Sequence, residues 1–133
     1  MYAKNATRGQ WKAHGRYIAR ESASQGRAVE AGFDATDQGI NIATRLDEWQ
    51  LAGDGRTWKL IVSPEFGDKI DLVQLTRDLM KRMTRDLDTR LEWVAVSHFN
   101  TDNPHVHIAL RGAGLPRCPT MFDIRALAYK DPQ

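Results

Sequence analysis

The sequence predicts a single α+β domain in which helices pack on an antiparallel-rich sheet. Three observations support this fold class. Apolar residues recur at helical spacing between residues 72 and 87. An apolar run at residues 91–96 and an alternating run at residues 106–110 have the patterns of buried strands. The polar segment of residues 99–104 between them has the composition of a turn, so the two runs are expected to pair as a β-hairpin.

Length and composition are those of one globular domain. The chain has 133 residues, of which 41% are hydrophobic and 27% are charged, and a chain of this size can bury a core without covalent staples. Cys118 is the only cysteine, so we expect no intrachain disulfide and a reducing, cytoplasmic location. No apolar run has the length of a membrane span and no secretory leader opens the chain, so no membrane insertion is expected.

Charge is distributed unevenly along the first half of the chain. Residues 1–27 hold six basic residues and one acidic residue, a net charge of +5. Residues 28–57 hold two basic and six acidic residues, a net charge of −4. A basic first segment favours an anionic partner, with nucleic acid the leading candidate. The alternative is a solvated helix face without a partner.

Residues 8–24 are predicted to form the first helix. Trp11, His14 and Ile18 recur at spacings of three and four residues and define its apolar side. Basic residues recur every four positions and are expected to form one stripe on this helix: Arg8, Lys12, Arg16 and Arg20. Tyr17 lies three residues after His14 and therefore beside it on the helix. By itself this pattern is equally consistent with an aromatic ring that covers the edge of the core.

The next segments predict a linker, a helix and a strand. Residues 26–36 are polar and are expected to form a linker or a sheet edge. A second helix is predicted from about residue 37 to residue 51, with Gly53 as its C-terminal stop. Residues 58–63 are apolar and β-branched, and they predict a strand that ends at Pro64.

The third helix, residues 72–87, has the most regular pattern. Asp71 can cap its first turn, with Gln74 three residues further on. Its apolar face consists of Leu72, Leu75, Leu79, Met83 and Leu87. Because this helix connects the strands at residues 58–63 and 91–96, we expect a crossover connection, with the hairpin adding an antiparallel neighbour. The helices are expected to pack on one face of the sheet, or nearly so.

Three of the four histidines lie in the predicted hairpin. His105 and His107 are two residues apart on one strand, so their rings leave the same face. The turn brings His98, at the end of the other strand, close to His105. Three imidazoles on rigid strands, with room left for water or substrate, match a catalytic metal site rather than a closed four-ligand structural site. We therefore expect a divalent metal; the alternative is three polar residues on a solvent-facing strand.

Three passages of the sequence resemble the catalytic domain of conjugative relaxases. These mobilisation nucleases include the T-DNA border endonucleases and belong to the HUH endonuclease superfamily. Residues 14–21 (HGRYIARE) resemble the tyrosine motif of the family, residues 58–65 (WKLIVSPE) its second motif, and residues 93–112 its histidine motif. The resemblance implies an HUH-type β-α-β-β core, with the tyrosine on the N-terminal helix. Residues 1–112 are expected to be the relaxase-like catalytic domain, and residues 113–133 a divergent, truncated tail.

The resemblance also implies an activity: nicking and transfer of single-stranded DNA at the transfer origin of a plasmid or mobile element in the bacterial cytoplasm. Tyr17 falls on the nucleophile position, which forms a 5′-phosphotyrosine and releases a 3′-hydroxyl. His98, His105 and His107 fall on the positions that hold one divalent ion, either Mg²⁺ or Mn²⁺, with Zn²⁺ also compatible. The basic stripe would follow the DNA backbone. Relaxosome accessory proteins and a coupling protein would be partners.

The sequence departs from the family pattern after the first histidine. Asn100 and Thr101 stand where many relaxases place an acidic residue. Asp102, one position further, is the candidate for a carboxylate that orients a ligand. Ser63 falls near a serine position linked to DNA contact. His14 is interpreted as a helix-surface histidine rather than as a base or a DNA contact.

Three alternatives to an active relaxase stay open at this point. A rolling-circle replication initiator uses the same constellation, although a tyrosine motif placed before the histidines favours the relaxase. A cleavage-impaired remnant would bind DNA through the sheet and the basic helix without cutting it. A zinc hydrolase would use a bound water as its nucleophile and would act on another substrate without Tyr17.

Overall fold

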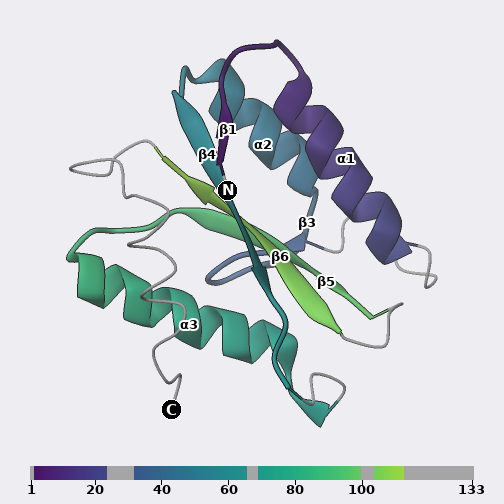
Figure 1. Ribbon diagram of the computed structural model, residues 1–133, viewed down its shortest axis with the longest axis vertical. Helices are drawn as coiled ribbons and strands as arrows, with labels where there is room; N and C mark the ends of the chain where they lie inside the picture. The colour runs from purple at the N-terminus through teal and green to yellow at the C-terminus, as the bar shows by residue number, and fades with distance from the viewer. Residues whose placement is uncertain (1, 24–31, 66–68, 100–103, 113–133) are drawn as a thin grey trace.

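The computed structural model describes residues 2–23, 32–65, 69–99 and 104–112. Its helices are α1 (Gln10–Ala23), α2 (Ile42–Leu51) and α3 (Leu72–Leu87). Its strands are β1 (Tyr2–Lys4), β2 (Gly32–Phe33), β3 (Gln38–Ile40), β4 (Arg56–Val62), β5 (Trp93–His98) and β6 (His105–Arg111). Figure 1 shows one sheet between α3 on one side and α1 with α2 on the other. The predicted α+β class is confirmed.

The six strands form a single sheet in the order β1-β4-β6-β5-β2-β3, and every neighbouring pair is antiparallel. Because β6 lies between β4 and β5, these two strands run parallel to each other, and α3 makes the predicted crossover between them. The predicted hairpin is confirmed as well. Its register runs from the pair Trp93 and Leu110 to the pair His98 and His105.

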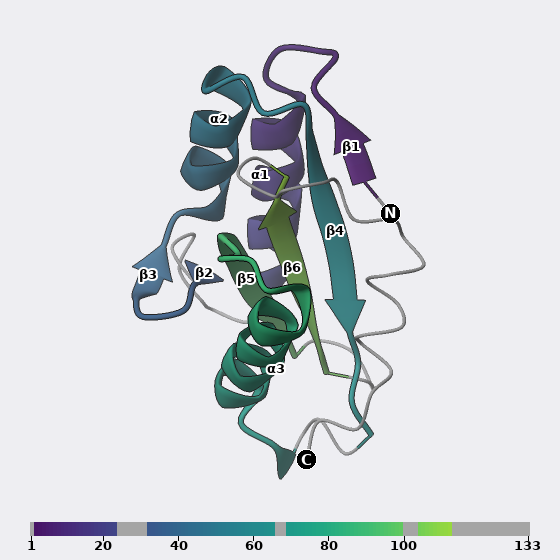
Figure 2. The same ribbon diagram turned by 90° about the vertical axis from the view of Figure 1, so that its left-hand side faces the viewer.

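Helices cover both faces of the sheet, which corrects the expectation that they would pack on one face. In Figure 2 the ribbon of α3 lies in front of β5 and β6, and the ribbon of α1 lies behind them. Alternate residues of β5 explain this arrangement. Trp93 and Ala95 belong to the core formed with α3, whereas Val94 and Val96 belong to the core formed with α1 and α2. A strand that is apolar at consecutive positions has two faces to bury.

The first helix begins later than the sequence pattern predicts. α1 starts at Gln10 rather than at residue 8, because Gly9 adopts a φ of 80°, a left-handed conformation that a continuous helix does not contain. Arg8 therefore precedes the helix, and the helical part of the predicted basic stripe is Lys12, Arg16 and Arg20. Within α1, Trp11 and Ile18 are buried as predicted.

The second helix is shorter than predicted, because residues 38–40 form the strand β3. Asn41 caps α2: its side-chain oxygen accepts a hydrogen bond from the backbone N–H of Thr44 at 3.1 Å. Gly53, the predicted stop, has a φ of 92° just after the helix. Of the predicted linker or edge at residues 26–36, residues 26–31 lie outside the described ranges, and the remainder begins with the strand β2.

The third helix agrees with its prediction at both ends. Asp71 accepts a hydrogen bond from the backbone N–H of Gln74 at 3.1 Å, and the helix ends at Leu87. Its most buried residues are Leu72, Thr76, Leu79, Met80 and Met83. This face packs on β5 and β6, opposite to the side that carries the histidines, so α3 supports the hairpin from behind.

α1 and α2 approach so closely that one position of α1 admits no side chain. A Cβ atom added to Gly15 would lie 2.6 Å from the Cα and 3.0 Å from the backbone nitrogen of Ala43. Glycine inside a helix costs about 1 kcal/mol relative to alanine. The close packing of the two helices explains why the chain carries that cost here.

We expect Gly15→Ala to destabilise the protein by about 1–3 kcal/mol, although alanine is the better helix former, because the new methyl group meets backbone atoms that cannot rotate away. Denaturant unfolding followed by circular dichroism measures the change. Gly55→Ala is the matched control: a Cβ there has nothing within 4 Å, so its effect stays within about 0.5 kcal/mol. A Gly15→Ala protein more stable than the parent would contradict the close contact.

Candidate metal centre

The register of the hairpin brings three histidines together on one face of the sheet. His98 pairs with His105, and His107 pairs with Val96, so all three rings leave on the side of α1 and α2. The ring centroids of His98 and His107 are 4.4 Å apart, and His105 lies 5.1 Å from His98 and 5.0 Å from His107. One ring nitrogen of each residue lies within 4.8 Å of the others. We call these three residues the histidine cluster.

His98 is oriented by the helix that covers it. Its side chain is only 1% exposed, and its Nε2 lies 3.0 Å from the backbone carbonyl oxygen of Ile18 in α1. Since a carbonyl oxygen can only accept, Nε2 carries a proton, and in the neutral imidazole Nδ1 carries the lone pair. Hydrogen bonds of this kind fix the tautomer and the ring orientation of metal-binding histidines.

The histidine cluster fits a divalent metal ion in its chemistry as well as in its spacing. Burial, followed by the nearby His98, His105 and His14, lowers the pKa of His107 to about 4. Its imidazole is therefore neutral near pH 7, which is the form that binds a metal. A set of three imidazoles suits borderline ions such as Zn²⁺ and binds Mn²⁺ more weakly.

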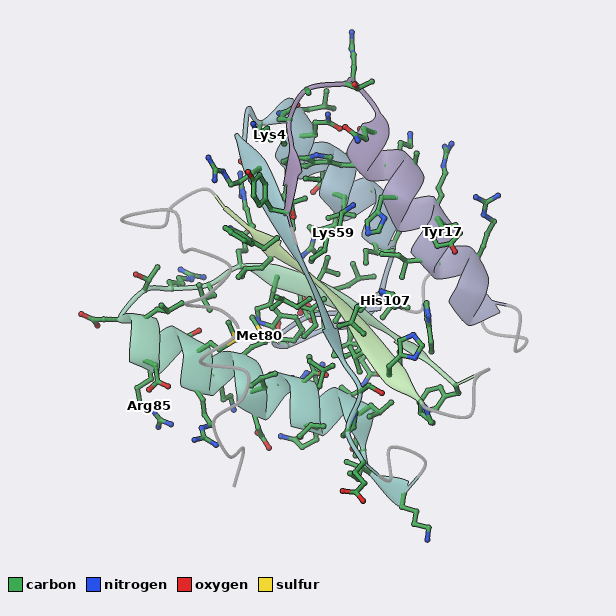
Figure 3. All side chains as sticks on the ribbon, viewed as in Figure 1. Lys4, Tyr17, Lys59, Met80, Arg85 and His107 are labelled. Atoms are coloured by element: carbon green, nitrogen blue, oxygen red, sulfur yellow. The ribbon has the colours of Figure 1, made fainter. Side chains whose placement is uncertain are left out.

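Tyr17 lies on α1, next in sequence to the residue that contacts the histidine cluster. Its side chain is 56% exposed, and the carbonyl oxygen of the following residue, Ile18, is the one that accepts from His98. Figure 3 shows Tyr17 on α1 and His107 on the side of the sheet that faces this helix. The structure thus brings the helix of the predicted nucleophile onto the predicted metal-binding hairpin.

The remaining predicted site residues are placed less centrally. Arg16 and Arg20 are exposed on α1, Lys12 is half-buried, and Arg8 is exposed before the helix. Ser63 is exposed directly after β4. Asp102, the candidate carboxylate, lies outside the described residues. Residues 113–133, the predicted tail, lie outside them too.

Comparison with known families gives an independent result. Residues 6–114, most of the chain, match the family model described as "Relaxase: MobA/VirD2-like, nuclease domain". The chain belongs to this relaxase family. Searches of curated proteins and of solved structures found no match. Relaxase nuclease domains nick DNA, and the six-stranded antiparallel sheet with three described helices is consistent with an HUH-type fold.

None of the helices described in this relaxase domain combines the length and the apolar character that crossing a membrane requires. The histidine cluster is compatible with the metal binding on which relaxases depend.

Lys59 was not predicted as a site residue, and His14 was predicted to lie on the surface of the helix. Lys59 lies in the middle of β4, opposite Ala109 of β6, and is half-buried on the face that carries the histidine cluster. His14 is half-buried as well. Burial, and then the charge of Lys59, lower the pKa of His14 to about 4. The available signal was a lone lysine inside an otherwise apolar strand.

We expect the relaxase domain to bind about one equivalent of Mn²⁺ or Zn²⁺. His105→Asn should weaken this binding at least ~10-fold, because loss of a residue that only supports a metal ligand already weakens binding by about this factor. Isothermal titration calorimetry measures both stoichiometry and affinity. His14→Asn is the matched control, because His14 is not one of the three clustered residues. Equal losses in the two variants would contradict a three-histidine site.

We expect Lys59→Gln to raise the pKa of His14 above its value of about 4, because the lysine charge opposes protonation of the imidazole. The pKa should remain below 6.5, since burial is the larger cause of the shift. In the parent protein, stability that depends on neutral His14 is lost as the pH falls from 6.5 towards 4. NMR titration of the imidazole signals measures the shift; an unchanged or lower pKa would disprove the contact.

Proposed function

We propose that this relaxase domain nicks one strand of DNA by attack of the Tyr17 hydroxyl on a backbone phosphodiester, and that it then transfers the strand. The substrate we propose is single-stranded DNA at the transfer origin of a plasmid or mobile element in a bacterial cell. The observation that carries the proposal is the 3.0 Å hydrogen bond between His98 and the carbonyl oxygen of Ile18. It ties the residue that follows Tyr17 to the histidine cluster.

In this reaction the phenolic oxygen of Tyr17 forms a bond to phosphorus and loses its proton. The bond from phosphorus to the 3′ oxygen breaks, and that oxygen takes a proton to become a free 3′-hydroxyl. The 5′ end of the DNA stays attached to the protein as a phosphotyrosine, so the energy of the phosphodiester is kept for rejoining. A water nucleophile would not keep this covalent link.

His98, His105 and His107 would hold a divalent ion. When bound there, the ion supplies stabilisation of the negative charge that develops on the phosphate oxygens. Tyrosine has an ordinary pKa of about 10, so it needs positive charge or a base nearby to react at neutral pH. His98 is held in place by α1, so the helix that carries the nucleophile also orients a metal ligand.

Two further features support a single-stranded substrate. Tyr17 is more than half exposed, so a splayed phosphate can reach its hydroxyl without unfolding of α1. Arg16 and Arg20 are exposed on the same helix, where they can contact phosphates that flank the attacked one. Relaxosome accessory proteins and a coupling protein are the partners that this function would need.

We expect the domain to form a covalent adduct with DNA in the presence of Mn²⁺, and Tyr17→Phe to abolish it, because phenylalanine has no hydroxyl to attack phosphorus. A pool of single-stranded oligonucleotides with random sequence serves as substrate. Denaturing electrophoresis separates the adduct, and sequencing of the attached DNA gives the preferred nick site.

The control is Tyr2→Phe, since Tyr2 is another exposed tyrosine, on β1 at the sheet edge. This variant should form the adduct as the parent does. Cleavage that survives Tyr17→Phe would favour a hydrolase with a water nucleophile. Binding of DNA with no adduct in the parent protein would favour a cleavage-impaired remnant.

A further inference from the structure

Lys59 occupies an unusual position for a charged residue. It is the fourth residue of β4 and lies between Trp58, which is buried, and Leu60, which packs against the same core. The register places Lys59 opposite Ala109 of β6. Cross-strand partners point to the same face, and Ala109 lies in the core beneath α1 and α2. Figure 3 accordingly shows Lys59 and His107 on the same side of the sheet.

No carboxylate of the chain segments described here pairs with Lys59. Asp34 instead pairs with Arg45, and Asp54 and Glu92 pair with Arg111. The charge of Lys59 acts instead on His14 of α1. Burying a cation costs free energy unless an anion pairs with it, and none of the carboxylates in the described part of the chain does so, which favours another role for Lys59.

The face of β4 that carries Lys59 is open to solvent at the next position along it. Ile61, two residues further, pairs with His107 and is 64% exposed. A large apolar side chain directly beside a metal-binding histidine is thus accessible from solution. An extended DNA strand lying on the histidine cluster would pass over this part of β4.

We propose that Lys59 binds a backbone phosphate of the DNA strand beside the histidine cluster, and that it positions the strand for the reaction. This inference rests on the proposed function, because it takes DNA as the substrate. An ammonium group donates charge-assisted hydrogen bonds to phosphate oxygens, and partial burial strengthens them. Lys59 lies on the face that carries the histidine cluster, and no carboxylate of the described residues pairs with it, so its charge is available to a phosphate.

Lys59→Met tests the proposal in a Tyr17→Phe background, without added metal, so that the result depends on neither cleavage nor the metal. The probe is a fluorescent single-stranded oligonucleotide of random sequence, and fluorescence anisotropy gives the affinity at several salt concentrations. We expect the affinity to fall about 10-fold, the effect of one lost charge-assisted hydrogen bond. The slope of log K against log salt should become shallower by about 0.7, the value for one phosphate contact on a single strand.

The unfolding temperature separates a binding role from a structural one. Since methionine keeps the apolar stem of lysine and removes an unpaired charge, Lys59→Met should leave this temperature unchanged or raise it. Lys81→Met is the matched control, because Lys81 is exposed on α3, on the opposite face of the sheet. Its affinity and salt slope should equal those of the parent.

Three results would overturn the proposal: an unchanged affinity, an unchanged salt slope, or equal effects from Lys59→Met and Lys81→Met. Once the nick site is known, the contacted phosphate can be located by replacing single phosphates with neutral methylphosphonates. At the contacted position, the losses from Lys59→Met and from the neutral phosphate should not add. A lysine effect on DNA binding in a protein that forms no covalent adduct would support this contact while refuting the proposed cleavage.

Discussion

The antiparallel pairing of β5 with β6 is the constraint on which the site depends. A slip of one residue would turn each side chain of a strand to the other face, and His98 would then leave His105 and His107. The register is fixed twice, because both faces of the hairpin are buried. Ile108 packs on the α3 side, and Val96 packs on the side of α1. The position of the histidine cluster is therefore a consequence of core packing rather than of the loop that joins the two strands.

The two faces of the sheet differ in the residues that they carry. The face under α3 is an apolar core built around Trp58, Met80 and Trp93. The opposite face packs Trp11, Trp49 and their neighbours. It carries the histidine cluster at one end of the strands and Lys59 in the middle of β4. Half-burial of these polar groups explains the low pKa of His14 and of His107. Neutral imidazoles are the result, and metal binding needs them in that state.

The sequence predicted the elements whose signals are local. The cap at Asp71 and the repeat of apolar residues fix α3, and alternation around the histidines fixes β6. The sequence pattern predicts that Arg8 and residues 38–40 are helical, because the spacing of side chains carries no information on backbone conformation. Gly9 and Gly39 have φ of 80° and 72°, and the helices do not extend through them. The continuous apolar run of β5 did signal burial on both faces, which one layer of helices could not provide.

Within the site, the sequence could place the three histidines relative to one another, since one hairpin holds them all. It could not place Lys59 or His14 relative to the cluster, because these residues come from β4 and α1 and meet it only through tertiary packing. The same reason explains why the contact of Ile18 with His98 has no signature in the sequence: a backbone carbonyl oxygen is present in every residue.

The missing side chain at Gly15 has a consequence for Tyr17, two residues further along α1. Because the surface of α1 meets the backbone of Ala43 directly, the helix has little freedom to roll about its own axis. The hydrogen bond from His98 to the carbonyl oxygen of Ile18 limits its sliding along that axis. Together these two contacts restrict the direction in which the ring of Tyr17 projects from the axis of α1. A residue with no side chain thus limits the direction in which the Tyr17 hydroxyl projects from α1.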